Sequence, residues 1–367
     1  MSNLFKLNNK YLLRGSVSLV PLQDKKTIEF FKSNTRVSYK ILLEENLINL
    51  LSSLNGELSL KELIDNLGLD TIKTLNFINY LEEKKLIETD LIHQKIKKHQ
   101  FNHVLNFLAD YIKIENLLNE FDKLQNSHVI IIGLGAVGSW VAMELGKSGI
   151  ENFTLIDTDT VDISNLNRSY YTRKDIDTKK ILVVKNTLQK INANISCKLI
   201  DRNLTSSSFI KEIIHDISTQ NKIVINCADK PNVDTTSAWI NTACLETNIP
   251  FIIAGGYNLH LTLLGPTILP YESACFECIQ SQLMENDKID DLLKSKKLVK
   301  VNRNIGNIAP MAIITSTFVV NETIRTLLRS KHIYPIMINR RGNFNYFNHQ
   351  IKFFDFKRLD ACMACCK

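Results

Sequence analysis

The sequence predicts an α/β protein, namely a doubly wound, Rossmann-like parallel sheet preceded by a small N-terminal winged helix-turn-helix module. The first indication is a wholly apolar run at Val129–Ile132 that ends in glycines spaced G-x-G-x-x-G, which are Gly133, Gly135 and Gly138. Such a run is typical of a strand buried on both faces that turns tightly into a helix. The second indication is the alternation of short apolar runs and helix-like segments from there on. The expected strands are 129–132, 153–156, 196–199, 223–226 and 251–253, and the expected helices are 137–147, 180–192, 207–216 and 237–247.

The composition of the chain is that of an ordinary globular protein. It has 367 residues, of which 44% are hydrophobic, and a formal net charge of +7. This charge is mild for the length, so we interpret it as an aid to solubility and expect no nucleic-acid partner. No apolar run is long enough to cross a bilayer, and the N-terminus lacks the apolar core of a signal peptide. We therefore expect a cytoplasmic protein with no membrane partner, whose eight reduced cysteines serve metal binding or packing.

Residues 1–90 are predicted to form the separate N-terminal module. Its clearest signal is a capping box at Ser59–Glu62, which opens a short helix that ends at Gly68. The other expected elements are a β-hairpin over 11–20 around Gly15, a helix over 41–54, a third helix over 71–84 and a wing strand over 85–89. This order of elements is that of a winged helix-turn-helix.

The winged helix-turn-helix order is familiar from DNA-binding proteins, but the third helix argues against that function. Residues 71–84 contain as many acids as bases and no Arg, whereas a helix in the major groove presents Arg or Lys to bases and phosphates. Two other interpretations stay open at this point. The module is either a helical cap on the larger domain or a peptide clamp, in which an extended peptide adds a strand to the hairpin edge and lies against the third helix.

The large domain is expected over 128–367, after a polar, helix-prone linker at 91–127. Its glycine-rich turn predicts a nucleotide site, because bare backbone N–H groups and the start of a helix favour a phosphate. Asp157 ends the second expected strand, where it would meet a ribose. This pattern alone is typical of NAD or FAD, so an NAD-dependent oxidoreductase is one possible function.

The residues that follow the second expected strand favour ATP instead. The charged and polar candidates are Asp159, Asn165, Arg168, Lys180 and Asp229. A dinucleotide needs no such Arg and Lys, whereas two cations that converge on a triphosphate, with an acid that holds Mg²⁺ near the α-phosphate, suit adenylyl transfer. Any one of these charges would most often be a solvated surface group, but their joint order favours a shared function.

These motifs resemble those of the ThiF/MoeB/HesA adenylating family, relatives of the ubiquitin-activating enzymes. The resemblance runs from about Leu105 to the C-terminus. It implies that the site binds ATP and Mg²⁺ and adenylates a carboxylate at a protein or peptide C-terminus. In detail it implies that Asp157 holds the ribose, that Arg168 and Lys180 neutralise phosphates, and that Asp229 positions Mg²⁺.

The layout is most similar to that of family members of the microcin C type, which adenylate a peptide and carry an N-terminal precursor-recognition module. This likeness favours a peptide clamp over a cap for residues 1–90, and it implies a precursor or leader peptide as the partner. No cysteine lies between Cys278 and Asn307, where thioester-forming relatives carry one. We therefore do not expect the activated carboxylate to pass to a thiol of the enzyme.

Two cysteine pairs predict a metal site. Cys275 with Cys278, and Cys362 with Cys365, form C-x-x-C…C-x-x-C. Four thiolates suit a tetrahedral Zn²⁺ site, and a site closed by four protein ligands is structural. Cys366 adjoins the second pair and competes as a ligand, but the x-x spacing favours Cys365. The long gap between the pairs is what the resemblance implies. The remaining cysteines lie in apolar settings and are interpreted as packing residues: Cys197, Cys227 and Cys244.

The chain departs from the family pattern in two places. Relatives carry an Arg pair before the first strand, which reaches the ATP of the partner subunit in a homodimer, whereas residues 102–108 contain no Arg. In addition, Ser169 stands where Gln is usual after the Arg motif, and Asp177–Thr178 replaces the usual Gly before the next helix. Loss of the Arg would remove transition-state stabilisation unless another group replaced it.

The sequence therefore predicts an adenylyltransferase that activates a carboxylate of a ribosomally synthesised precursor peptide during maturation of a natural product such as a bacteriocin. We expect catalytic roles for Arg168, Lys180 and Asp229, a homodimer, and ATP, Mg²⁺ and Zn²⁺ as cofactors. The alternative, motivated by the missing Arg, is a ThiF-like protein that only binds a leader peptide and delivers it to a separate cyclodehydratase in azole or thiopeptide biosynthesis. The oxidoreductase is less favoured because no catalytic acid–base pair is evident.

Overall fold

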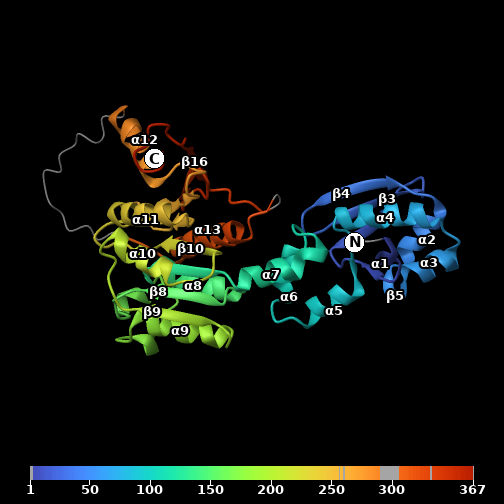
Figure 1. The fold of residues 1–367 in the computed structure, drawn as a ribbon, viewed down its shortest axis with the longest axis horizontal. Coiled ribbons are helices and arrows are strands. Elements are labelled where there is room, and N and C mark those ends of the chain that lie inside the picture. Colours follow the sequence, from blue (N-terminus) through green and yellow to red (C-terminus); the bar gives the residue numbers. More distant parts are fainter. Residues whose placement is uncertain (1–2, 256, 259–260, 290–305, 331–332, 367) are drawn as a thin grey trace. The chain divides into compact units, whose positions relative to one another are not determined.

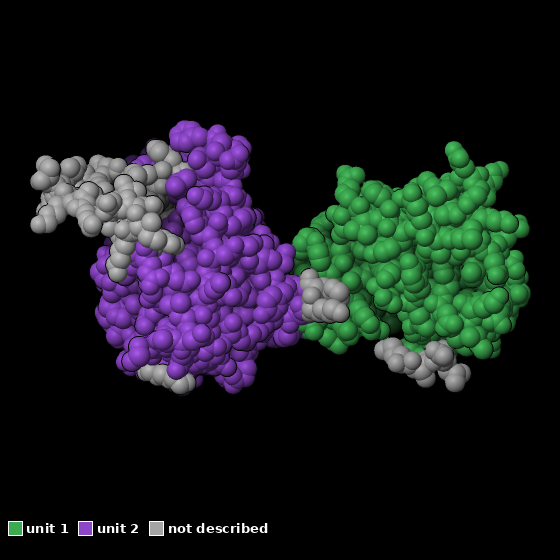
Figure 2. All heavy atoms as spheres, turned by 90° about the horizontal axis from the view of Figure 1, so that it is seen from above, with its two compact units in different colours: residues 1–121 green, residues 122–367 purple. Residues whose placement is uncertain are grey.

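The computed structural model divides the chain into two units, residues 1–121 and residues 122–367 (Figure 2). The structure describes residues 3–255, 257–258, 261–289, 306–330 and 333–366. In this described part of the chain, no helix is both long and apolar enough to cross a membrane. The second unit carries the glycine-rich turn and the two cysteine pairs.

The centre of the second unit is a six-stranded sheet with the order β14-β11-β10-β7-β8-β9. Its strands are β7 (His128–Ile132), β8 (Asn152–Ile156), β9 (Ser196–Ile200), β10 (Lys222–Asn226), β11 (Phe251–Ile253) and β14 (Thr267–Ile268). All neighbours are parallel except β14, which pairs antiparallel with β11. The predicted α/β class with a mainly parallel sheet is confirmed, and each of the five predicted strands is present. The residues of β10 and β11 are buried throughout, as expected for strands covered on both faces.

Helices cover both faces of this sheet (Figure 1). They are α8 (Ala136–Lys147), α9 (Lys180–Ile191), α10 (Ser207–His215), α11 (Val233–Thr247), α12 (Phe276–Ile289) and α13 (Ala309–Leu328). Apolar residues of α10 and α11 share one core cluster with Ile130 and Val224 of the sheet, whereas α8 packs with α9 and α13. The predicted helix over 237–247 starts earlier, at Val233, because the Asn232 side chain accepts a hydrogen bond from the Thr235 N–H at 2.8 Å.

The order of the strands places two loops at one crevice. The chain leaves β7 toward β8 and β9, then crosses back to β10 on the other side of β7. Loops that follow β7 and β10 therefore diverge from the carboxyl edge of the sheet, which is the position where doubly wound sheets bind ligands. The glycine-rich turn lies in the first loop and residues 227–230 lie in the second.

A second, antiparallel sheet adjoins the C-terminal part of this unit. Its strands, in the order β12-β13-β15-β16, are β12 (Tyr257–Asn258), β13 (Leu261–Leu264), β15 (Arg340–Asn345) and β16 (Ile351–Asp355). A buried carboxylate, Glu322 of α13, accepts hydrogen bonds from the Thr267 hydroxyl and from the Ile336 and Met337 N–H groups. Because each oxygen has a donor, this acid ties α13 to β14 of the central sheet and to the segment that precedes β15.

The first unit contains two three-stranded antiparallel sheets, β5-β1-β6 and β2-β3-β4. Its strands are β1 (Lys10–Leu13), β2 (Val17–Pro21), β3 (Thr27–Lys32), β4 (Val37–Leu42), β5 (Asn55–Ser59) and β6 (Ile87–Thr89). Its helices are α1 (Asn3–Leu7), α2 (Glu45–Ser53), α3 (Leu60–Leu67), α4 (Thr71–Glu83), α5 (Asp90–Lys98), α6 (Asn102–Leu108), the 3-10 turn η1 (Ile114–Asn116) and the start of α7 (Leu117–Gln125). The predicted capping box at Ser59–Glu62 is confirmed, as is the end of this helix at Gly68, which adopts the left-handed conformation. The winged helix-turn-helix assignment is not established by this arrangement and stays a prediction.

The predicted hairpin around Gly15 is wrong. β1 pairs with β5 and β6, whereas β2 pairs with β3 in the other sheet. The reason is the buried Arg14 between the two strands, which donates to Asp110 Oδ1 at 2.9 Å and to the Ala109 carbonyl at 3.0 Å. The chain is anchored at this point and passes into the second sheet instead of returning along β1. These contacts also explain why the first unit extends beyond residue 90, to residue 121.

The predicted helix over 41–54 is wrong in its first turn. Residues 37–42 form β4, which pairs along its whole length with β3, and the helix α2 begins at Glu45. Ile41 is in register with Ile28 of β3. Its apolar side chain therefore belongs to the strand, although its spacing from the apolar residues that follow also fits a helix. The sheet β2-β3-β4 is an element that the sequence did not predict.

Candidate functional site

The glycine-rich turn after β7 is held by close backbone contacts. Gly133 has a φ of +86°, and a Cβ there would lie 2.8 Å from the Cys227 carbonyl oxygen. A Cβ at Gly138 would lie 1.9 Å from the Gly133 oxygen, so neither position accepts a larger residue. A Cβ at Gly135, the N-cap of α8, would meet no atom of the described residues within 4 Å. The turn therefore leaves open space beside the N-terminus of α8, where an anion is favoured.

Asp157 at the end of β8 orders this turn. Its Oδ2 accepts from the Leu134 N–H at 2.6 Å, and its Oδ1 accepts from the Asp159 N–H at 2.7 Å. Each carboxylate oxygen has a further lone pair, so this engagement leaves acceptors for a ligand hydroxyl. The buried Tyr171 hydroxyl donates to the Leu134 carbonyl at 2.6 Å, and burial raises the pKa of Tyr171 well above its usual value. The sequence reasoning missed Tyr171, because a single Tyr after a polar loop carries no recognisable signal.

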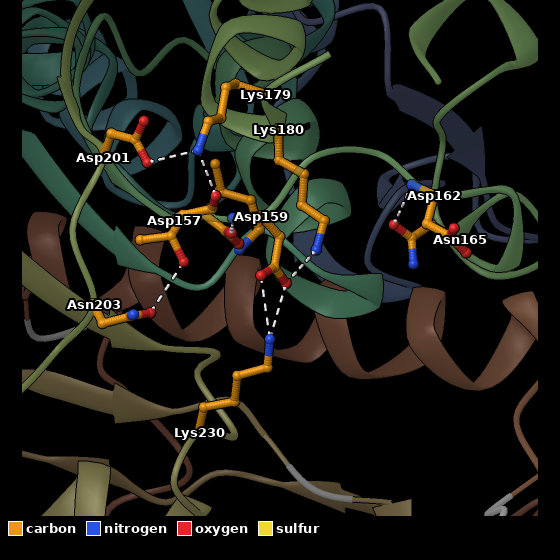
Figure 3. Close-up of polar contacts among 11 residues, drawn as sticks. Asp157, Asp159, Asp162, Asn165, Lys179, Lys180, Asp201, Asn203 and Lys230 are labelled. Atoms are coloured by element: carbon orange, nitrogen blue, oxygen red, sulfur yellow. Dashed lines mark hydrogen bonds and ion pairs between the residues drawn. The ribbon is translucent and has the colours of Figure 1, made fainter. Parts of the chain in front are cut away.

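Asp159 joins two lysines from different loops (Figure 3). Lys180, the first residue of α9, places its Nζ 3.0 Å from Asp159 Oδ2, and Lys230, after β10, places its Nζ 3.1 Å from Oδ1. Burial alone would raise the pKa of Asp159, but the hydrogen bonds and charges of Lys180 and Lys230 outweigh it and hold that pKa below its usual value. Asp159 in turn raises the pKa of Lys230. Sequence reasoning named Asp159 and Lys180 but missed Lys230, although the basic residue directly after Asp229 was a signal.

A second charged pair flanks this group. Lys179 donates to Asp201 Oδ1 at 3.0 Å and to the Thr158 carbonyl at 2.7 Å, and the Thr158 hydroxyl donates to Asn203 Oδ1 at 3.0 Å (Figure 3). These contacts tie the loop after β9 to the loop after β8. The three lysines of this surface are thus already paired with Asp159 or Asp201.

Asn165 and Arg168 form their side-chain hydrogen bonds within their own turn and not with the Asp159 group. Asn165 Oδ1 accepts from the Asp162 N–H at 3.0 Å and closes the 3-10 turn η2 (Ile163–Asn165), to one side of the lysines in Figure 3. Arg168 donates to the Ser164 carbonyl at 2.5 Å, within its own turn. The indole N–H of Trp140 in α8 donates to the Arg168 carbonyl at 3.1 Å, so the turn is attached to the helix that begins at the glycines.

Asp229 lies exposed in the loop after β10. That loop starts in a fixed position, because the buried Asn226 side chain accepts from the Ala228 N–H at 3.1 Å and donates to Thr236 and Ser237. Among the described residues, no hydrogen bond or ion pair engages the Asp229 carboxylate. It is therefore available to a cation, and oxygen ligands are those that Mg²⁺ prefers.

The four predicted cysteine ligands come together. The Sγ atoms of Cys275, Cys278, Cys362 and Cys365 all lie within 4.8 Å of one another and are buried. Three of the sulfur–sulfur distances are 3.6–3.7 Å, whereas a tetrahedral zinc with bonds of about 2.3 Å would place its sulfurs about 3.8 Å apart. The Leu359 N–H donates to Cys278 Sγ at 3.4 Å, an outer contact typical of metal thiolates. The cluster could bind zinc.

Cys366 does not belong to this cluster. Its thiol is exposed and donates to the Leu359 carbonyl at 3.1 Å. The other cysteines are partly or fully buried: burial raises the pKa of Cys197 to about 11 and raises those of Cys227 and Cys244 further. Thiols with raised pKa values are poor nucleophiles and behave as packing residues.

Comparison with known proteins gives one family and two kinds of relative. The model of the ThiF family matches residues 112–364. The ThiS sulfur carrier protein adenylyltransferase of Escherichia coli K12 is 32% identical over 169 residues, which cover 45% of this chain and 63% of that protein. Ubiquitin-like modifier-activating enzyme 5 of Dictyostelium discoideum is 27% identical over 235 residues, which cover 62% of this chain and 59% of that protein. The chain therefore spans less than two thirds of the length of the curated relatives that it matches.

Solved structures are similar over nearly the whole chain. E. coli MccB in complex with AMPCPP and MccA superimposes with a TM-score of 0.74 at 21% identity, covering 97% of this chain and 99% of that one. PaaA superimposes with a TM-score of 0.70 at 19% identity, covering 94% of this chain and 100% of that one. At such identities the likeness establishes the fold, which includes the first unit as well as the second.

Proposed function

Because the chain belongs to the ThiF family, we propose that it is an ATP-dependent adenylyltransferase that activates a carboxylate of a ribosomally synthesised precursor peptide. The observation that carries this proposal is the pair of ammonium groups, Lys180 and Lys230, that converge on Asp159 beside an open glycine turn. An oxygen of the peptide carboxylate attacks the α-phosphorus of ATP. The bond from that phosphorus to the bridging β-phosphate oxygen breaks, and pyrophosphate leaves with the bonding electron pair.

In this proposal each part of the carboxyl edge has one task. Backbone N–H groups of the turn Gly133–Gly138 and the start of α8 bind phosphate oxygens. Asp157 accepts from the ribose hydroxyls, while Lys180 neutralises the charge that builds up on the leaving pyrophosphate. Arg168 and Asn165 would complete the phosphate site from the neighbouring turn. Since Arg168 now donates to the Ser164 carbonyl, it has to leave that bond to reach a nucleotide.

Two metals fit the residues present. The free Asp229 carboxylate would hold Mg²⁺, which supplies charge neutralisation at the phosphates when bound. The four buried thiols, Cys275, Cys278, Cys362 and Cys365, would hold a structural Zn²⁺ that ties the C-terminus to α12. All four positions of a tetrahedron are filled by protein ligands, so this ion has no open position for a substrate.

The first unit is proposed to bind the precursor peptide. The solved MccB includes complexes with the peptide MccA, and the likeness extends over the first unit of this chain. In the described residues β4 (Val37–Leu42) pairs on one edge only, with β3. A peptide added as a strand to the free edge would satisfy backbone groups that are otherwise left to water. We also propose a homodimer in the cytoplasm, as the family resemblance implies.

The test is ATP–pyrophosphate exchange with candidate precursor peptides. We expect exchange that depends on the peptide and falls at least about 100-fold in Asp229→Ala, because removal of a group that holds the reacting phosphates costs transition-state stabilisation. The matched control is Asp216→Ala, an exposed carboxylate paired with Lys198, which should retain exchange. Exchange that is absent in the wild type, or equal in Asp229→Ala, would overturn the proposal.

The alternative of a non-catalytic leader-binding partner for a cyclodehydratase is not favoured. A protein that only binds peptide has no need of steric glycines at two positions of a nucleotide turn, or of two lysines beside it. Calorimetry separates the two functions, since that alternative requires peptide binding without ATP binding.

A further inference from the structure

We propose that Lys230 is a second phosphate-binding cation of the nucleotide site, and that Asp159 holds it in place until a polyphosphate takes over both lysines. This inference rests on the proposed function and extends it to a residue outside the expected set. Figure 3 shows Lys230 pointing toward Asp159 from the side opposite to Lys180. The Lys230 Nζ lies 3.1 Å and 3.3 Å from the two oxygens of that carboxylate.

The position of Lys230 follows from the topology of the sheet. It lies in the loop after β10, the neighbour of β7, and that loop touches the glycine turn where Gly133 approaches the Cys227 carbonyl. Lys180 comes from the opposite side of β7, after β8. The two ammonium groups therefore approach the glycine turn from the two strands that flank β7, so an anion on that turn would meet a cation on each side.

The two lysines differ in freedom of movement. The side chain of Lys180 is 7% exposed and fixed, whereas that of Lys230 is 72% exposed. Within the described residues, Lys230 makes hydrogen bonds with Asp159 alone. An exposed ion pair is worth little in water, so release of Lys230 toward a more highly charged partner has a small cost.

The charge balance favours such a transfer. One carboxylate shared by two ammonium groups leaves a net charge of about +1 in this group at neutral pH. A triphosphate offers oxygens to both lysines and carries several negative charges, whereas Asp159 compensates the two ammonium groups with a single charge. AMP lacks the β- and γ-phosphates, so we expect Lys230 to distinguish ATP from AMP.

A purely indirect role for Lys230 is the competing explanation. In that case Lys230 only neutralises Asp159, and its removal would leave a carboxylate that repels the phosphates. Both explanations give weaker ATP binding in a single variant. They differ in a double variant in which the carboxylate is also removed.

The experiment is calorimetric titration of the full chain with ATP in the presence of Mg²⁺, and separately with AMP. We expect Lys230→Ala to weaken ATP binding about fivefold to tenfold, as for one charge-assisted hydrogen bond at a partly exposed site. AMP binding should change less than about twofold, and Lys230→Arg should restore most of the ATP affinity. Lys198→Ala, which removes a surface lysine from its pair with Asp216, is the control for the loss of one positive charge.

The double variant decides between direct and indirect action. If Lys230 contacts the phosphates, Asp159→Asn/Lys230→Ala binds ATP about fivefold to tenfold more weakly than Asp159→Asn alone. Equal affinities of these two variants would overturn the inference, as would equal losses for ATP and AMP in Lys230→Ala. A wild-type chain that binds no ATP overturns the proposed function as well, whereas normal ATP binding in Lys230→Ala overturns this inference only.

Discussion

The glycine turn and the cysteine cluster both join segments that are distant in the sequence, but different forces hold them. The turn is shaped without a ligand, by steric contact between Gly133, Gly138 and Cys227 and by two N–H groups on Asp157. The cluster brings four thiols into a buried volume where an ion would replace weak sulfur contacts by strong bonds. The comparison teaches that the nucleotide edge should survive removal of its ligand, whereas the C-terminal segment should depend on the proposed zinc.

The largest effect is therefore expected at the cluster. Cys275→Ala should abolish stoichiometric zinc binding and destabilise the second unit by at least about 4 kcal/mol, because binding of structural zinc is coupled to folding. For a unit of this size, such a loss corresponds to a fall of roughly 10 °C or more in the unfolding temperature. Metal analysis and thermal unfolding measure the two effects together.

Cys366 provides the matched control for that variant. Its thiol is exposed and bonds to the Leu359 carbonyl, so Cys366→Ser should retain about one zinc per chain and lose little stability. Zinc loss from Cys366→Ser, with retention in Cys365→Ser, would assign the fourth ligand to the other residue. Full zinc loading of Cys275→Ala would contradict the cluster as a metal site.

The second largest effect separates the shape of the glycine turn from its ligand. Gly138→Ala places a methyl group 1.9 Å from the Gly133 oxygen, so we expect a loss of about 3 kcal/mol or more in the free energy of unfolding. Gly135→Ala meets open space among the described residues, so its stability should change by less than about 1 kcal/mol. Its methyl group instead points toward the proposed phosphate, and ATP affinity should fall. Urea unfolding and calorimetry on both variants check this contrast.

The cluster and the turn also differ in how far the sequence predicted them. Spacing alone identified the four cysteines, because C-x-x-C places two thiols on one side of a turn wherever it occurs. The glycine motif and Asp157 were equally visible, since they belong to one continuous βαβ segment. Lys230 was missed because its partner, Asp159, is contributed by a different loop, and only the strand order brings the two together. Tyr171 was missed because a single Tyr after a polar loop carries no signal of its bond to the Leu134 carbonyl.

The first unit shows where local pattern fails. The apolar residues of 37–42 alternate as in a strand. The last of them are also at helical spacing from the apolar residues of α2, so the sequence predicted one continuous helix. The contact that turns the chain out of β1 is an ion pair between Arg14 and Asp110, 96 residues apart. Local pattern cannot reveal such a pair, whereas the parallel sheet of the second unit repeats one local unit several times.

A smaller effect on the free energy of unfolding is expected from pH, through His128 at the start of β7. Burial, followed by the charges of Lys222 and Lys198, lowers the pKa of His128 to about 4 from 6.5. The fold therefore prefers neutral His128, so this contribution is fully present above pH 6.5 and is lost as the pH falls from 6.5 toward 4. Between pH 7.5 and pH 5 we expect wild type to lose about 1–2 kcal/mol more than His128→Gln, after allowance for solvent screening.

Urea unfolding of the second unit at the two pH values measures that difference, and the carboxylates common to both proteins cancel. His215→Gln, near the exposed end of α10, is the control for loss of a histidine. Identical pH dependence in wild type and His128→Gln would show that the imidazole is not kept neutral by the fold.

The smallest effect is expected at a residue with positive φ that is not glycine, and it tests why other such positions require glycine. Asp177 has a φ of +64° in the loop before α9, at the place where the family resemblance implies a Gly. Asp177→Gly relieves about 1 kcal/mol of backbone strain but gains a similar amount of entropy in the unfolded chain. The net change in the free energy of unfolding should therefore stay within about 0.5 kcal/mol.

Gly133→Asn supplies the contrast. Asn tolerates positive φ, but its Cβ would still lie 2.8 Å from the Cys227 oxygen. This variant should therefore lose several times more stability. Similar losses for both variants in urea unfolding would mean that conformation alone, and not close approach of the two loops, requires glycine in the turn.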